Sequence, residues 1–134
     1  MIEITSGTPE NLVIAVAHGK VTGDDYEKVL LPAIEAALKT HTKIRLLYQL
    51  SNDFHGFSAD AVWDDAKLAF SHLTGFEAIA IVTNAAWITD AVKFLGFFMR
   101  FPVKAFSNDK LAEAKDWVAN TAAWMSLAEA GKKI

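Results

Sequence analysis

Residues 78–83 read AIAIVT, an unbroken run of small and β-branched apolar residues that ends at Thr83. A run of this length is typical of a strand whose two faces are both buried in a parallel sheet. Apolar residues recur with helical spacing before it, over residues 58–73, and after it, over residues 85–100. Strands that alternate with helices are joined by right-handed crossovers. The pattern therefore predicts an α/β fold with a mostly parallel sheet and with residues 78–83 as its central strand.

The rest of the chain continues this alternation and gives five strands and four main helices. The first two strands flank a turn at residues 8–10 and form a hairpin, so the first strand is predicted to be an antiparallel edge. The predicted strands cover residues 2–5, 11–18, 44–50, 78–83 and 103–106, and apolar residues follow helical spacing over residues 26–38, 58–73, 85–100 and 111–118.

Polar residues and prolines mark where these helices begin and end. Thr22 and Asp25 have the spacing of a capping box, and Asn84 is placed to cap the third helix. Pro32 either kinks the first helix or begins its main body. Asn120 and Thr121 are expected to end the last helix before an apolar C-terminal segment.

The composition is that of one globular domain. The 134 residues are 52% hydrophobic and 22% charged, with no cysteine and a net charge of −3. These values exclude a disulfide framework and a thiolate site, and they disfavour general binding of nucleic acid. No apolar run is long enough for a transmembrane segment, and residues 1–10 do not resemble a signal peptide. We therefore expect a cytoplasmic protein with a single domain over residues 1–134, of which residues 121–134 are a C-terminal extension.

Several local patterns, in this order, resemble the SpoIIAA-like family, a relative of the STAS domains of anti-sigma-factor antagonists. They are residues 19–22 (GKVT), Asp25-Tyr26, Pro32, residues 60–65 (DAVWDD), residues 76–82 (FEAIAIV), Trp87 and residues 113–118 (EAKDWV). The resemblance implies a mostly parallel five-stranded sheet with an antiparallel edge strand and helices stacked as a short β/α superhelix. By itself it implies little about function, because one fold hosts many activities. Together with the absence of catalytic motifs, it favours a non-enzymatic interaction or regulatory module that binds a protein partner.

Ser58 is the candidate regulatory phosphoserine. STAS antagonists carry a phosphorylated serine at the start of the helix after the third strand, and Ser58 occupies the nearest position here. The surrounding motif of those antagonists is absent, and Asp60 would repel a phosphate. The alternative is that Ser58 is a plain helix N-cap.

The other polar groups form no catalytic or metal motif. Asp53, His55 and Ser58 supply the side-chain types of a hydrolase triad, but they lie in one short loop, whereas triads draw their members from separate elements. The four histidines lack the spacing of metal ligands, although His18 and His55 are expected on the same rim of the sheet. No glycine-rich phosphate loop is present. We expect no enzyme activity, no metal and no cofactor.

The third predicted helix has a wider apolar arc than contact with one sheet face requires. Either neighbouring helices cover its flanks, or it forms an apolar groove or contact surface. The candidate ligand or interface residues are Trp87, Phe94, Phe97, Phe98, Phe101 and Trp124. Two functions stay open: a module that binds a protein partner or forms a homodimer, and a carrier of a small apolar or lipid-like ligand. A mean hydropathy of +0.21 favours the second.

Overall fold

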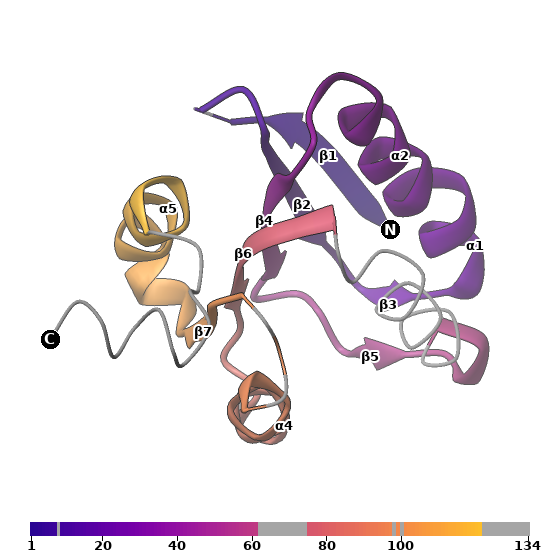
Figure 1. Cartoon of the computed structure of the whole chain (residues 1–134). Coiled ribbons are helices and arrows are strands. Elements are labelled where there is room, and N and C mark those ends of the chain that lie inside the picture. Colours follow the sequence, from indigo (N-terminus) through magenta and orange to yellow (C-terminus); the bar gives the residue numbers. More distant parts are fainter. Residues whose placement is uncertain (8, 62–74, 98, 100, 122–134) are drawn as a thin grey trace, which may run out of the picture.

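A five-stranded sheet with the strand order β1-β2-β4-β6-β7 organises the computed structural model of this chain (Figure 1). The structure describes residues 1–7, 9–61, 75–97, 99 and 101–121. The strands are β1 (Ile2–Ser6), β2 (Leu12–Ala17), β4 (Ile44–Leu50), β6 (Phe76–Val82) and β7 (Val103–Phe106). β1 pairs antiparallel with β2, and the other neighbours are parallel. The predicted α/β sheet with an antiparallel edge is confirmed.

The central strand is β4, so the prediction that residues 78–83 form the centre is wrong. In β4 the consecutive residues Leu46, Leu47 and Tyr48 are all buried, which requires cover on both faces. In β6 buried residues alternate with half-buried ones such as Ile79 and Ile81. The apolar run over residues 78–83 therefore overstates how completely one face of β6 is covered, and it does not determine the order of the strands.

The first helical segment changes its winding twice. It begins as α1 (Gly23–Asp25), continues as a π-helical turn, η1 (Tyr26–Leu30), and ends as α2 (Leu31–Thr40). The wider turn accommodates Pro32, because the proline ring would meet the carbonyl of residue 28 in a regular α-helix. Pro32 lies at the start of α2, which confirms that the main body of the helix begins there.

The remaining helices differ from prediction mainly at their ends. α4 (Ala86–Gly96) stops before residue 100, and Asn84 bonds to Asn52 and Asn108 in neighbouring loops. A 3₁₀ turn, η3 (Asn108–Lys110), precedes α5 (Leu111–Asn120), which ends where predicted. Most of the predicted helix over residues 58–73 lies outside the described residues. Within the described part of the chain, no helix has the length and apolar character needed to cross a membrane.

Two groups of buried side chains cover the two faces of the sheet. On one face the first helical segment and α4 pack on the strands through Leu30, Ile34 and Ile88. On the other face α5 packs through Ala114 and Val118. Figure 1 shows α5 on the side of the sheet opposite to α1 and α2. A second, unpredicted sheet consists of two short parallel strands, β3 (Lys20–Val21) and β5 (Gly56–Phe57).

The capping box at Thr22 and Asp25 is confirmed. The Thr22 amide donates to the Asp25 carboxylate at 2.8 Å, and the Asp25 amide donates to the Thr22 hydroxyl. Burial by itself raises the pKa of Asp25, but the hydrogen bonds from Thr22, together with the ammonium group of Met1, hold it below the ordinary value of 3.8. Because the pKa of Asp25 is lower in the folded chain than in the unfolded chain, its ionised form stabilises the fold at pH values above the unfolded-state pKa. This stabilisation is lost as the pH falls through the folded-state pKa.

We predict that Asp25→Asn lowers the free energy of unfolding at pH 7 by about 1 kcal/mol, because it weakens the cap of the first helix. Urea unfolding at several pH values measures the difference between the two proteins. This difference shrinks below about pH 4, where Asp25 becomes protonated in the unfolded chain and then in the folded one.

Asp24→Asn is the matched control. Asp24 is exposed and its only described ion pair is with the exposed Lys28, so its removal changes stability by about 0.5 kcal/mol or less. A difference between wild type and Asp25→Asn that stays constant on acidification would contradict the role given to Asp25.

Candidate functional site

A cavity of about 160 Å³ lies where the carboxyl-terminal ends of β4 and β6 face α4. We call it the aromatic pocket, because four of its lining residues carry aromatic rings. Its wall consists of Tyr26, Tyr48, Leu50, Phe57, Ile81, Trp87, Ile88, Ala91 and Val92. The carboxyl ends of parallel strands are where open α/β folds bind ligands, so the position of the cavity suits a binding site.

Two tyrosines from separate elements meet at this cavity. The hydroxyl oxygens of Tyr26, in η1, and Tyr48, in β4, lie 3.0 Å apart, and their ring centroids lie 6.4 Å apart. Both residues are buried. A buried hydroxyl without a partner is costly, so the mutual hydrogen bond favours this arrangement over others. The pair therefore fixes the position of the first helical segment relative to the central strand.

The small β3–β5 sheet places a third ring. The amide of His55 donates to Gly19 at 3.0 Å and the amide of Ser58 donates to Val21 at 2.8 Å, which brings Phe57 of β5 to the pocket. Gly56 has a φ of +146°, a conformation that is essentially restricted to glycine. The turn into Phe57 therefore depends on this glycine.

The mouth of the aromatic pocket lies beside Trp87, at the start of α4. Trp87 lines the cavity although its side chain is 63% exposed, and Ala91, one turn later, also lines the cavity and is exposed. The Trp87 ring meets the Phe57 ring edge-on, with the ring centroids 6.4 Å apart and the planes at 85°. The two rings form one side of the entrance.

The face of α4 that packs on the sheet differs from the expected one. Ile88 is buried and Val92 is half-buried, whereas Phe94 is 64% exposed and Phe97, just after the helix, is 87% exposed. At 100° per residue, Trp87 and Phe94 lie at the middle of the helix's apolar side and Ile88 lies on its flank, so the sequence predicts that Trp87 and Phe94 pack on the sheet. Neighbouring elements therefore leave Trp87, Phe94 and Phe97 uncovered, and an apolar contact surface on α4 stays a prediction.

The other predicted site residues have separate positions. Phe101 is buried in the core with its ring against Phe76 (centroids 5.8 Å apart), so it is not part of the exposed surface. Phe98 and Trp124 lie outside the described residues. Ser58 precedes the helical residues that begin at residue 59, and its hydroxyl accepts a hydrogen bond from the amide of Ala61 and donates to Asp60. This is the geometry of an N-cap; phosphorylation of Ser58 stays a prediction.

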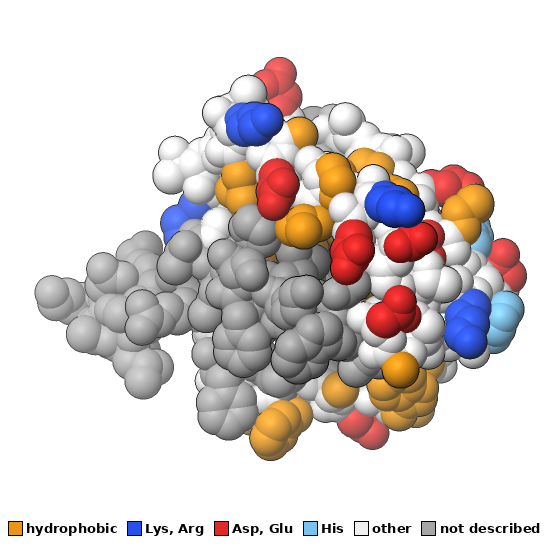
Figure 2. Space-filling model, turned by 90° about the vertical axis from the view of Figure 1, so that its right-hand side faces the viewer, with side chains coloured by type: hydrophobic (Ala, Val, Ile, Leu, Met, Phe, Trp, Pro, Cys, Tyr) orange, Lys and Arg blue, Asp and Glu red, His pale blue; other side chains and the backbone are white. Residues whose placement is uncertain are grey.

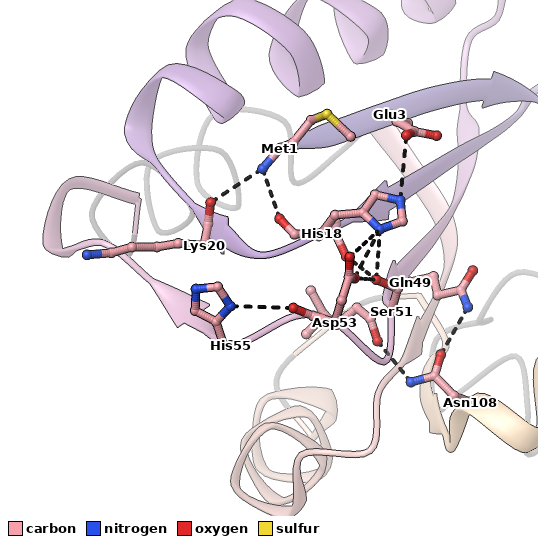
Figure 3. Close-up of polar contacts among 11 residues, drawn as sticks. Met1, Glu3, His18, Lys20, Gln49, Ser51, Asp53, His55 and Asn108 are labelled. Atoms are coloured by element: carbon pink, nitrogen blue, oxygen red, sulfur yellow. Dashed lines mark hydrogen bonds and ion pairs between the residues drawn. The ribbon is translucent and has the colours of Figure 1, made fainter.

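Polar side chains also gather at this edge of the sheet. Glu3, His18, Ser51 and Asp53 form a group that we call the histidine cluster (Figure 3). His18 Nδ1 lies 3.0 Å from both Asp53 Oδ1 and Ser51 Oγ, and Nε2 lies 3.7 Å from Glu3 Oε1. Hydrogen bonds from Ser51 and His18 lower the pKa of the Asp53 carboxyl. His55 lies on the same rim, as expected.

The histidine cluster does not have the geometry of a hydrolase. In a catalytic triad the nucleophile and the carboxylate contact opposite nitrogens of the histidine, but Ser51 and Asp53 both face Nδ1 of His18. His55 is exposed and its ring faces the backbone oxygen of Asp53. Among the described residues, no three His, Asp or Glu side chains form a group that could hold a metal ion.

A network of amide side chains joins the loops that follow β4, β6 and β7. Asn84 donates to Asn52 and accepts from the backbone amide of Asn108. The Asn108 side chain in turn donates to the Leu50 carbonyl and accepts from Gln49. These bonds hold the ends of three strands together beside the aromatic pocket.

Sequence reasoning did not identify Tyr26, Tyr48 or Phe57 as site residues. Tyr26 was placed on the apolar stripe of the first helix, and Tyr48 was one residue of an apolar strand. One signal for the tyrosine pair was available in the sequence. Tyr26 and Tyr48 each carry a hydroxyl on an otherwise apolar surface, and a buried hydroxyl needs a hydrogen-bond partner. Phe57 gave no such signal, because it depends on the pairing of two very short strands.

Comparison with known proteins gives a family and a related structure. The SpoIIAA-like family model matches residues 12–119 of this chain. The chain is similar to the crystal structure of an uncharacterised DUF3478-family protein with a SpoIIAA-like fold from Shewanella loihica PV-4. The two chains are 30% identical, and the match covers 88% of this chain and 92% of the other, with a TM-score of 0.71. No curated protein matches the chain.

We predict that Gly56→Ala lowers the free energy of unfolding by about 1–3 kcal/mol. A Cβ atom at residue 56 would meet nothing within 4 Å, so the cost comes from the backbone conformation at φ +146°. Denaturant unfolding measures the change.

Gly96→Ala serves as the matched control, because the added Cβ would only reach ordinary contact with the Val103 carbonyl at 3.7 Å and no positive φ is required. It should leave stability nearly unchanged. Equal stability of Gly56→Ala and wild type would show that the turn into Phe57 does not need glycine.

Proposed function

We propose that this chain, which belongs to the SpoIIAA-like family, is a non-enzymatic binding module whose aromatic pocket holds a small apolar molecule. One observation carries this proposal: a cavity of about 160 Å³ with an apolar wall opens at the carboxyl-terminal ends of β4 and β6. A concave apolar site with a few polar groups is the usual form of a small-molecule site. The proposal develops the second function that the sequence left open.

The polar groups near the pocket support binding over catalysis. Ser51, Asp53 and His18 contact one another, and the amide side chains of Asn84 and Asn108 join loops. Each of these groups has a structural partner that its chemistry explains. None of them lines the aromatic pocket, so a molecule bound there would contact rings and aliphatic side chains.

A protein partner is the second candidate function, and a different observation favours it. Trp87, Phe94 and Phe97 are all more than 60% exposed. Figure 2 shows hydrophobic side chains along the lower edge of the face that carries β3 and β5. Large exposed apolar side chains that lie close together are typical of contact surfaces. A second copy of the chain or another protein would cover them in this function.

Ligand binding is tested by adding a small apolar compound to the wild type and to a variant with a substitution at the mouth of the pocket. We predict that toluene or 1-hexanol raises the free energy of unfolding of the wild type, by about 1.4 kcal/mol at about ten times the dissociation constant. Ala91→Phe fills the cavity from α4 and abolishes this increase. Denaturant unfolding with and without each compound measures it, and sedimentation of the same samples reports association between copies.

Ala112→Phe is the matched control, because Ala112 is also an exposed alanine of a helix but lies on α5, away from the pocket. It should keep the full response to the compound. If neither compound stabilises the wild type, or if Ala91→Phe responds as the wild type does, the pocket is not a ligand site. A stable dimer of the wild type would then favour the second candidate.

A further inference from the structure

We propose that the occupant of the aromatic pocket is a single uncharged aromatic ring with at most a short substituent, and not an acyl chain or a carboxylate. This inference rests on the proposed function and names its ligand class. Three properties of the described wall carry it: its volume, its lack of charge and its four rings.

The volume of the cavity matches one ring. An engineered apolar cavity of about 150 Å³ in another protein binds benzene, and the cavity here measures about 160 Å³. A molecule of that size fills the space between Tyr48, Ile81 and Ile88. A long acyl chain would leave most of its length in solvent beyond Trp87, where it would gain little from burial.

The part of the wall that the structure describes has no group that would compensate for a charge on the ligand. The described lining residues carry no acidic or basic side chain, and their only polar side-chain atoms are the two tyrosine hydroxyls and the indole nitrogen of Trp87. The two hydroxyls already bond to each other at 3.0 Å. A carboxylate or an ammonium group would therefore lose its hydration without gaining an ion pair, which is strongly unfavourable.

The rings in the wall favour an aromatic occupant over an aliphatic one of equal size. Tyr26 and Tyr48 lie at the buried side, and Phe57 and Trp87 lie at the entrance. Aromatic rings attract one another in edge-to-face and offset arrangements beyond the effect of buried area. Phe57 and Trp87 already adopt an edge-on arrangement at 85°, so a bound ring would extend an existing series of rings.

A ring also loses less conformational freedom than a chain. Each rotatable bond that becomes fixed on binding reduces affinity. The walls of the aromatic pocket come from four elements of the fold: the first helical segment, the five-stranded sheet, the β3–β5 sheet and α4. A flexible chain would have to adopt one conformation between them, whereas a rigid ring enters without this cost.

The experiment compares three probes on the full chain by following the methyl resonances of Ile81, Ile88 and Val92 in ¹H–¹³C spectra. Toluene and 1-hexanol have the same number of non-hydrogen atoms and differ in having a ring or a chain. Toluene and benzoate share the ring and differ in charge. We expect toluene to shift these resonances with a dissociation constant at least about 10-fold lower than that of either other probe. Ala91→Phe should remove the response, and Ala112→Phe should retain it.

The outcomes separate this inference from the function on which it rests. If 1-hexanol or benzoate binds at the same methyl groups as tightly as toluene, the pocket is a ligand site but the ligand class is wrong. If none of the three probes shifts these resonances, both the ligand class and the proposed function are wrong. Equal toluene binding by wild type and Ala91→Phe would place the probe elsewhere and would also contradict both.

Discussion

The hydrogen bond between the hydroxyls of Tyr26 and Tyr48 joins the first helical segment to the central strand, and the candidate site depends on it. Tyr48 lies in the middle of β4, between β2 and β6, so its ring projects from the most enclosed part of the sheet. Tyr26 reaches it from a π-helical turn that precedes Pro32. The π-helical turn that accommodates Pro32 thus begins with Tyr26, which lines the buried side of the pocket.

The two faces of the sheet are packed differently, and the difference explains where the cavity lies. On the α5 face, Arg45 donates to the carbonyls of Val118 and Thr121 at the end of the helix, and also to Glu77 of β6. These bonds hold α5 closely against β4 and β6. On the other face, α4 contacts the sheet through Ile88 and Val92 while Trp87 and Phe94 stay exposed. Ile88 and Val92 also line the aromatic pocket, so the cavity lies where α4 meets this face of the sheet.

Much of the fold could be predicted because its elements carry local signals. The strands at 44–50 and 103–106, the capping box of Thr22 and Asp25, and the end of α5 at Asn120 were located from sequence alone. The position of the central strand was not predicted, because an apolar run such as residues 78–83 identifies a strand but does not show which strands are its neighbours. The β3–β5 sheet was missed because strands of two residues have no periodicity.

The candidate site could be predicted only in part, and for a physical reason. Trp87 was identified because an aromatic residue stood on a helix with more apolar surface than one contact requires. Phe101 was given the same role from the same pattern, but it is buried against Phe76, since the chain leaves α4 at Gly96 and turns into the core. Helical spacing predicts which residues share a face only within the helix itself, and Phe101 lies beyond the end of α4. The tyrosine pair depends on contacts between distant segments, which spacing does not report.

The tyrosine pair and α4 line an apolar cavity that opens beside Trp87, at the carboxyl-terminal ends of β4 and β6. A crystal structure of the full chain under xenon pressure tests this claim most directly, because xenon enters apolar cavities of this size and is located by its electron density. We expect a xenon peak between Tyr48, Ile81 and Ile88, with the hydroxyls of Tyr26 and Tyr48 in hydrogen-bond contact. A structure with these hydroxyls apart, or with the space filled by side chains and no xenon in it, would show that the aromatic pocket does not exist as described.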